Sequence, residues 1–143
     1  TGGKGADLFR YPLFSDSSLS NLDTLVDFKA SEGDRIGLSA LPSALWSRGV
    51  ITPATPSLPA AVSLAFADKD ALTGGNQPLA SGEAVLFAFE ATPGQSLSRQ
   101  WHLAVNDANS AFGGTDDLLL RLSGSQPYSV AGNLTVTSVL AIL

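Results

Sequence analysis

The chain of 143 residues contains neither cysteine nor methionine, and each absence excludes something. Without cysteine there can be no disulfide, thiolate metal site or cysteine nucleophile. Because not even residue 1 is a methionine, we expect it to be an internal point of a longer protein. No run of about 18 apolar residues occurs, so the sequence predicts no span across a membrane.

Charge is also scarce: charged residues make up 15% of the chain, against 44% hydrophobic residues. This balance predicts a folded protein, because disordered chains combine low hydrophobicity with high net charge. The net charge is −5 and the 8 basic residues are scattered, so the sequence predicts no basic patch that would bind nucleic acid. The length is about that of one domain with a substantial core.

Short apolar runs separated by Gly, Pro, Asn, Asp and Ser clusters predict an all-β protein. In 99–105 and 118–122 the apolar residues alternate with others, which is typical of antiparallel strands with one buried and one polar face. The expected strands are 8–11, 24–28, 35–38, 62–67, 84–90, 99–105, 118–122 and 134–141.

Residues 42–60 differ in composition, since prolines lie there among Ser, Thr and Ala. Proline cannot donate a hydrogen bond within a sheet, so we expect an extended Pro-rich connector here. The predicted organisation is therefore residues 1–41, the connector 42–60, and an antiparallel β part at 61–143. The two β parts can still pack as one unit.

Residues 2–10 read GGKGADLFR, which matches the nonapeptide GGxGxDxUx of calcium-binding β-rolls, where U is apolar. Glycines permit backbone angles closed to other residues, so carbonyl groups in such a turn can point at one centre. Asp7 adds a charged oxygen, and Leu8 begins a short strand with its side chain expected to face the interior. Because calcium takes about six to eight oxygen ligands, a neighbouring turn must supply about half of them.

This motif and the segments after it resemble the C-terminal end of RTX proteins, in particular the region that closes the parallel β-roll of serralysin-type secreted metalloproteases. The matching segments are 2–11, the loop around 15–17, DTLVDF at 23–28 and GDRIGLS at 33–39. The chain departs from that family at Gly37, where an acid is usual, and in the spacing at 25–26. The resemblance implies the terminal turn of a parallel β-roll at 1–41, leading into an antiparallel β-sandwich.

Residues 73–79, 82–85 and 104–124 are similar to the tail, sometimes called a bluetail domain, that follows RTX repeats in many bacterial proteins. The RTX resemblance implies a calcium half-site formed by the carbonyls of Gly3 and Gly5 and the carboxylate of Asp7. Asp23 or Asp27 would complete the shell from the next element. The alternative is a turn that Asp7 caps without an ion.

No constellation of residues predicts an enzyme. The single histidine, His102, lies within an expected strand and is predicted to point outward, and neither GxSxG nor HExxH occurs. The loop 106–116 is rich in side-chain oxygens. It is either a second ion or ligand site or, as we favour, a turn capped by its own Asx hydrogen bonds with Phe112 tucked onto the core.

The resemblance implies a non-catalytic capping and export-associated module of a secreted, extracellular bacterial calcium-binding protein. Its partners would be the preceding RTX repeats and the type I secretion machinery, whose signal lies at the extreme C-terminus. Residues 139–143 are either that signal or a last core strand.

The alternative function is an extracellular ligand- or glycan-binding module. An exposed aromatic platform would favour it, and Tyr11, Trp46, Trp101 and Tyr128 are the only Trp and Tyr residues that could form one. We expect Trp101 to be buried.

Overall fold

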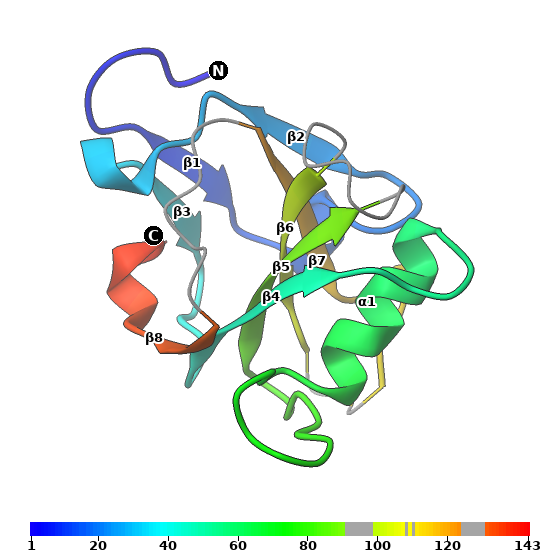
Figure 1. Ribbon diagram of the computed structural model, residues 1–143. Helices are drawn as coiled ribbons and strands as arrows, with labels where there is room; N and C mark the ends of the chain where they lie inside the picture. Colours follow the sequence, from blue (N-terminus) through cyan, green and yellow to red (C-terminus); the bar gives the residue numbers. More distant parts are fainter. Residues whose placement is uncertain (91–98, 108, 110, 124–130) are drawn as a thin grey trace.

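A computed structural model describes residues 1–90, 99–107, 109, 111–123 and 131–143 (Figure 1). In this part of the chain the protein is rich in β-structure, with one α-helix, α1 (Leu58–Ala67), and short 3₁₀ segments. No helix here is long and apolar enough to cross a membrane. The strands are β1 (Leu8–Tyr11), β2 (Asp23–Val26), β3 (Arg35–Leu38), β4 (Leu45–Ile51), β5 (Ala84–Glu90), β6 (Arg99–Val105), β7 (Leu118–Ser123), β8 (Gly132–Leu134) and β9 (Leu140–Ile142).

The strands form two sheets. The smaller has the order β1-β3-β9, and both of its pairs are parallel. The larger has the order β2-β7-β6-β5-β4-β8 and is mixed, with parallel pairs β2–β7 and β4–β5. The antiparallel arrangement predicted for 61–143 holds for β5–β6 and β6–β7. The large sheet as a whole is mixed, however, because β2 and β4 from the earlier part of the chain add parallel pairs, and the described structure shows no parallel β-roll. Strands from residues 1–41 also pair with β7 and β9, so both sheets connect the two predicted parts.

One core lies between the two sheets. The apolar side chains of β6 and β7 that alternate in the sequence point into this core, as predicted, and meet those of β3 and β9 from the small sheet. The members from these strands are Trp101, Leu103, Val105, Leu118, Leu120, Leu122, Ile36, Leu38 and Leu140.

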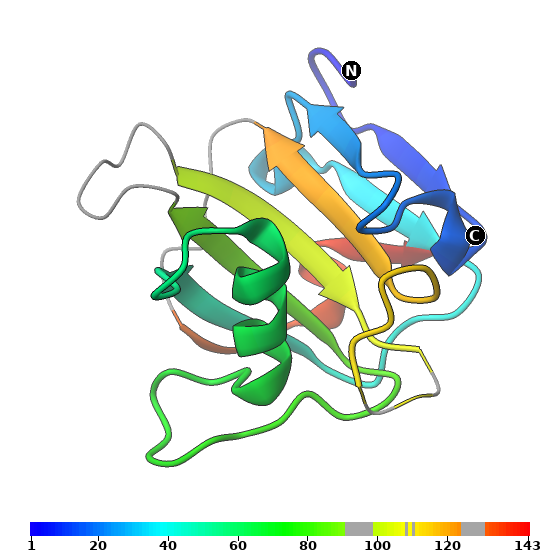
Figure 2. The same cartoon turned by 90° about the vertical axis from the view of Figure 1, so that its right-hand side faces the viewer.

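A second core lies on the opposite face of the large sheet, where α1 packs (Figure 2). Val62 and Phe66 of α1 lie there with Phe87 of β5 and Leu119 of β7. All 7 residues of β5 are buried. The expected polar face is thus covered in this region, because the helix shields it from water.

The predicted strand at 62–67 is wrong, since these residues form most of α1. Ser57 caps the helix by accepting a hydrogen bond from the backbone nitrogen of Ala60 at 3.3 Å, and Pro59 lies in the first turn, where no backbone donor is needed. Alanine-rich sequence favours a helix. A short apolar run does not by itself distinguish a buried strand from a buried helix.

The predicted connector at 42–60 is also corrected, because it contains β4, an internal strand of the large sheet. Pro42 and Pro53 lie outside β4, on either side of it. No proline therefore interrupts its hydrogen bonds to β5 and β8.

The apolar segment predicted as one strand at 134–141 is divided between the end of β8, the 3₁₀ turn η4 (Val136–Ser138) and β9. Val139 and Leu140 are almost fully buried in the core between the sheets. Residues 139–143 thus include a last strand that starts in the core, whereas Ile142 and Leu143 are exposed. An export signal at this end stays a prediction.

Candidate functional site

The glycine turn at residues 2–7 has the backbone geometry that its sequence predicts. Gly3 and Gly5 have φ angles of 93° and 101°, in the left-handed region that favours glycine. A Cβ on Gly2 would lie 2.6 Å from a carboxylate oxygen of Asp7. The turn therefore folds back so that the Asp7 carboxylate lies against the backbone of Gly2, a contact that a larger residue would block.

Asp7 is anchored through its backbone, which leaves part of its carboxylate unused. Its N–H donates to Oδ1 of Asp34 at 2.9 Å, and its carbonyl accepts from the N–H of Arg35 at 2.9 Å. The Oδ2 atom of Asp7 is buried and has no hydrogen-bond partner among the described residues. A buried, unpaired carboxylate oxygen is costly, so this atom is a chemically suitable cation ligand.

Sequence reasoning missed Asp34, which positions the turn. Its side chain is 1% exposed, and its two oxygens accept hydrogen bonds from the backbone nitrogens of Asp7 and Lys29, the second at 2.8 Å. This carboxylate joins the glycine turn to the segment that follows β2. The sequence feature that could have identified Asp34 is its position directly before the strand at 35–38, within the GDRIGLS segment.

The other predicted ligands have different partners. Asp23, in the large sheet, accepts a hydrogen bond from the Tyr11 hydroxyl at 3.2 Å, and burial together with this carboxylate raises the pKa of Tyr11. Asp27 has a φ of 67° and pairs with Nζ of Lys29 at 3.2 Å.

Across the described ranges, no three His, Cys, Asp or Glu side chains form a group that could hold a metal. Asp7, Asp23 and Asp27 thus do not form such a group by themselves. Calcium binding that relies on the carbonyls of Gly3 and Gly5 stays a prediction.

The side chain of Leu8 does not face the interior, as the sequence had suggested. It is 50% exposed, and its neighbour Phe9 packs against the core between the sheets. Adjacent side chains of a strand point to opposite faces, so only one of the two can be inward. Phe9 occupies the apolar position of the nonapeptide.

The loop after β6 is capped by its own side chains, as favoured from the sequence. The fully buried Asp117 accepts backbone hydrogen bonds from Asp107 at 2.8 Å and Gly113 at 2.6 Å, and burial raises its pKa. Asp107 in turn accepts from the backbone of Asn109 at 2.6 Å. Phe112 meets Phe66 of α1 edge-on, with ring centroids 5.1 Å apart.

His102 lies in β6 as expected, but the prediction that it points outward is wrong. It is fully buried and stacks on Phe87 with ring centroids 5.3 Å apart. Its Nδ1 lies 3.1 Å from the carbonyl oxygen of Gln100. Burial, helped by the nearby Arg121, lowers its pKa to about 4, so the ring is neutral at pH 7.

The aromatic residues do not gather on an exposed platform in the described structure. Tyr11 and Trp101 are each 7% exposed, which confirms the burial expected for Trp101. Trp46 is half-buried beneath Lys69, whose Nζ lies 4.7 Å from the ring centroid. Tyr128 lies outside the described residues.

Comparison with known proteins adds no relative: no family model, curated protein or solved structure matches this chain.

Proposed function

We propose that this chain is a non-catalytic end module of a secreted bacterial RTX-type protein and caps the parallel β-roll formed by preceding calcium-binding repeats. The observation that supports this proposal is the arrangement of β1. This strand follows directly on the glycine turn and pairs in parallel with β3, while its other edge has no strand partner among the described residues.

An unpaired edge is suited to receiving another strand. The backbone N–H and C=O groups on the open side of β1 can pair with a strand of a preceding repeat, as neighbouring turns of a roll do. The rest of the molecule would close the roll, because β3, β9 and the large sheet bury the apolar residues that the last turn would otherwise expose.

Calcium would be shared between this turn and the preceding one. The carbonyls of Gly3 and Gly5 and the Oδ2 atom of Asp7 supply one half of the shell, and the preceding repeat supplies the other half. Asp23 and Asp27 already have partners of their own, so we assign them a smaller part. Export through type I secretion machinery would precede ion-driven folding of the repeats.

Adding repeats in front of the intact chain tests the capping role. Several copies of GGKGADLFR are fused before residue 1, and calcium-induced strand formation is followed by circular dichroism. We expect the fused repeats to fold at a lower calcium concentration than the same repeats on an unrelated globular domain, because β1 provides a ready-made edge.

The Asp7→Ala variant of the fusion tests the contribution of the calcium ion separately from that of the open edge of β1. We expect it to lose one calcium ion by calorimetry, whereas Asp116→Ala in the distant loop keeps the full number. Equal calcium midpoints for the two carrier proteins would contradict the capping proposal.

A further inference from the structure

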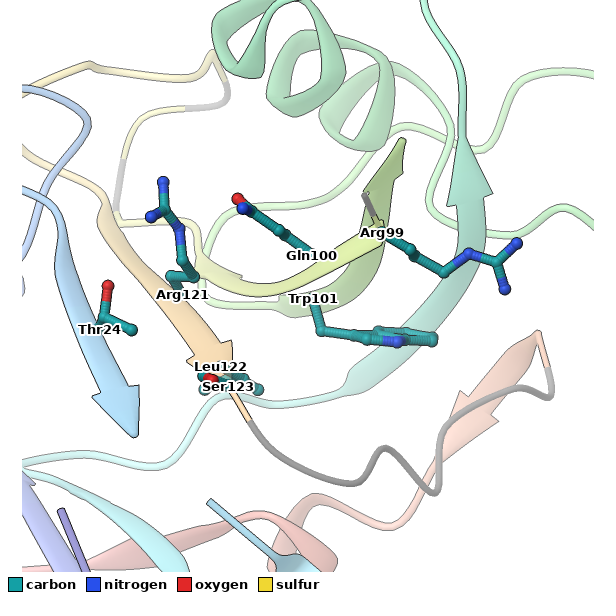
Figure 3. A pocket seen from close by; sticks show the side chains of 7 residues that line it. All are labelled: Thr24, Arg99, Gln100, Trp101, Arg121, Leu122 and Ser123. Atoms are coloured by element: carbon teal, nitrogen blue, oxygen red, sulfur yellow. The ribbon is translucent and has the colours of Figure 1, made fainter. Parts of the chain in front are cut away.

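A pocket of about 380 Å³ lies where β2, β7 and β6 meet, far from the glycine turn in the sequence (Figure 3). Its polar lining includes Thr24 of β2, Arg121 and Ser123 of β7, and Arg99 and Gln100 of β6. This volume is within the range of small-molecule sites, which runs from about 300 to 1,000 Å³.

Sheet register places three donor side chains of this pocket, those of Thr24, Gln100 and Arg121, on one face. Arg121 is paired with Thr24 on one side and with His102 on the other, and His102 is paired with Phe87, whose side chain lies in the core beneath α1. These side chains therefore share the α1 face of the sheet. Gln100 also lies on this face, two residues before His102 in β6, and Figure 3 shows the side chains of Arg121, Gln100 and Thr24 rising on the same side.

The guanidinium of Arg121 has no anion to balance it in the described structure. None of the ion pairs found there includes Arg121, whereas Arg99 pairs with Glu90 at 3.6 Å. The Nε atom of Arg121 is buried and has no hydrogen-bond partner among the described residues. The protein has a net charge of −5, yet Arg121 is a half-buried cation without a paired anion in the described structure. Because burying an unpaired charge is unfavourable, an anionic ligand would stabilise this site.

We propose that this pocket, which we call the Arg121 pocket, binds the carboxylate of a small organic acid such as a uronic acid. A guanidinium presents two parallel N–H donors that match the two oxygens of a carboxylate. Gln100 and Thr24, both exposed, supply an amide and a hydroxyl for the neighbouring hydroxyls of the ligand. The site is independent of the capping role, because it uses neither β1 nor calcium.

Titration of the intact chain with glucuronate, with glucose as the neutral counterpart, tests this assignment by calorimetry. We expect saturable binding of glucuronate and none of glucose. Arg121→Gln should weaken glucuronate binding at least about tenfold, and Arg121→Lys should also weaken it, because lysine keeps the charge but loses the paired donors. The matched control is Arg10→Gln, which removes the same charge from an exposed position on β1 and should leave binding unchanged.

An oligouronide, used as a second ligand, shows whether the bound carboxylate belongs to a polysaccharide or to a free acid. Tighter binding of an oligouronide than of glucuronate assigns the pocket to a polysaccharide, and equal binding assigns it to the free acid. Absence of saturable glucuronate binding, or an equal loss in Arg10→Gln, overturns the proposal. Should Arg121→Gln fail to fold, Gln100→Ala and Thr24→Val serve instead, and binding unaffected by both likewise overturns it.

Discussion

Asp34 shows how a single buried carboxylate can organise the end of a sheet. Its oxygens accept the backbone N–H groups of Asp7 and Lys29, which belong to segments on either side of β2. Because the side chain is almost fully buried, its removal would leave two partly buried backbone N–H groups without their acceptor.

We therefore expect Asp34→Ala to lower the free energy of unfolding by roughly 2–4 kcal/mol, since it leaves two partly buried backbone donors unpaired. Urea denaturation measures the change. Asp16→Ala is the matched control, because Asp16 accepts one backbone hydrogen bond from Leu13 at an exposed position and should cost less than about 1 kcal/mol. Equal losses in both variants would argue against the anchoring role of Asp34.

His102 gives the protein a defined pH dependence. Its folded-state pKa of about 4 lies below the ordinary value of 6.5, so the unfolded chain takes up the proton first as the pH falls. Stability due to the neutral ring is complete above about pH 6.5 and is lost progressively down to about pH 4, by roughly 3 kcal/mol in all.

Comparing wild type with His102→Gln at pH 7 and pH 4.5 isolates this contribution, because the carboxylates of the two proteins titrate alike. We expect the wild type to lose more stability than the variant over this interval. Parallel pH profiles from urea denaturation would show that His102 takes up its proton equally in both states.

At the scale of the element, α1 is the feature that gives the large sheet a second buried face. Phe66 lies on the inner side of the helix and is 6% exposed, whereas Leu64 is 45% exposed. The helix begins at a good capping residue, yet a helix this short depends on packing for its stability.

Phe66→Ala should lower the free energy of unfolding by about 3 kcal/mol, because it removes a buried ring and its edge contact with Phe112. Leu64→Ala should cost less than about 1 kcal/mol, since an exposed side chain gives up little buried surface. Thermal unfolding of the two variants provides the comparison, and a similar drop in both would contradict the packing of α1 seen here.

At the scale of the whole molecule, the two sheets and α1 bury their apolar residues against one another, with no ion needed in either core. We therefore expect the fold of residues 61–143 and its thermal unfolding temperature to be unaffected by chelation with EGTA. Calorimetry with and without calcium decides the point. Unfolding of the whole chain on chelation would mean that calcium is integral to the sheets.

Local sequence signals determined much of this fold. The predicted segments 8–11, 35–38, 84–90 and 99–105 coincide with β1, β3, β5 and β6. Short apolar runs, alternating in 99–105 and continuous within 84–90, mark these strands together with the turn-forming residues that bound them. The left-handed angles of Gly3 and Gly5 also followed from the motif.

Tertiary structure alone decided which strands pair and what covers them. The sequence did not separate the helix at 58–67 from a strand, because packing decides the state of a short apolar run. Asp34 acquires its role, and Arg121 meets Thr24, only through pairings between distant segments. The physical reason is that a strand fixes where its own side chains point, whereas its neighbours are chosen by which apolar faces can be buried together.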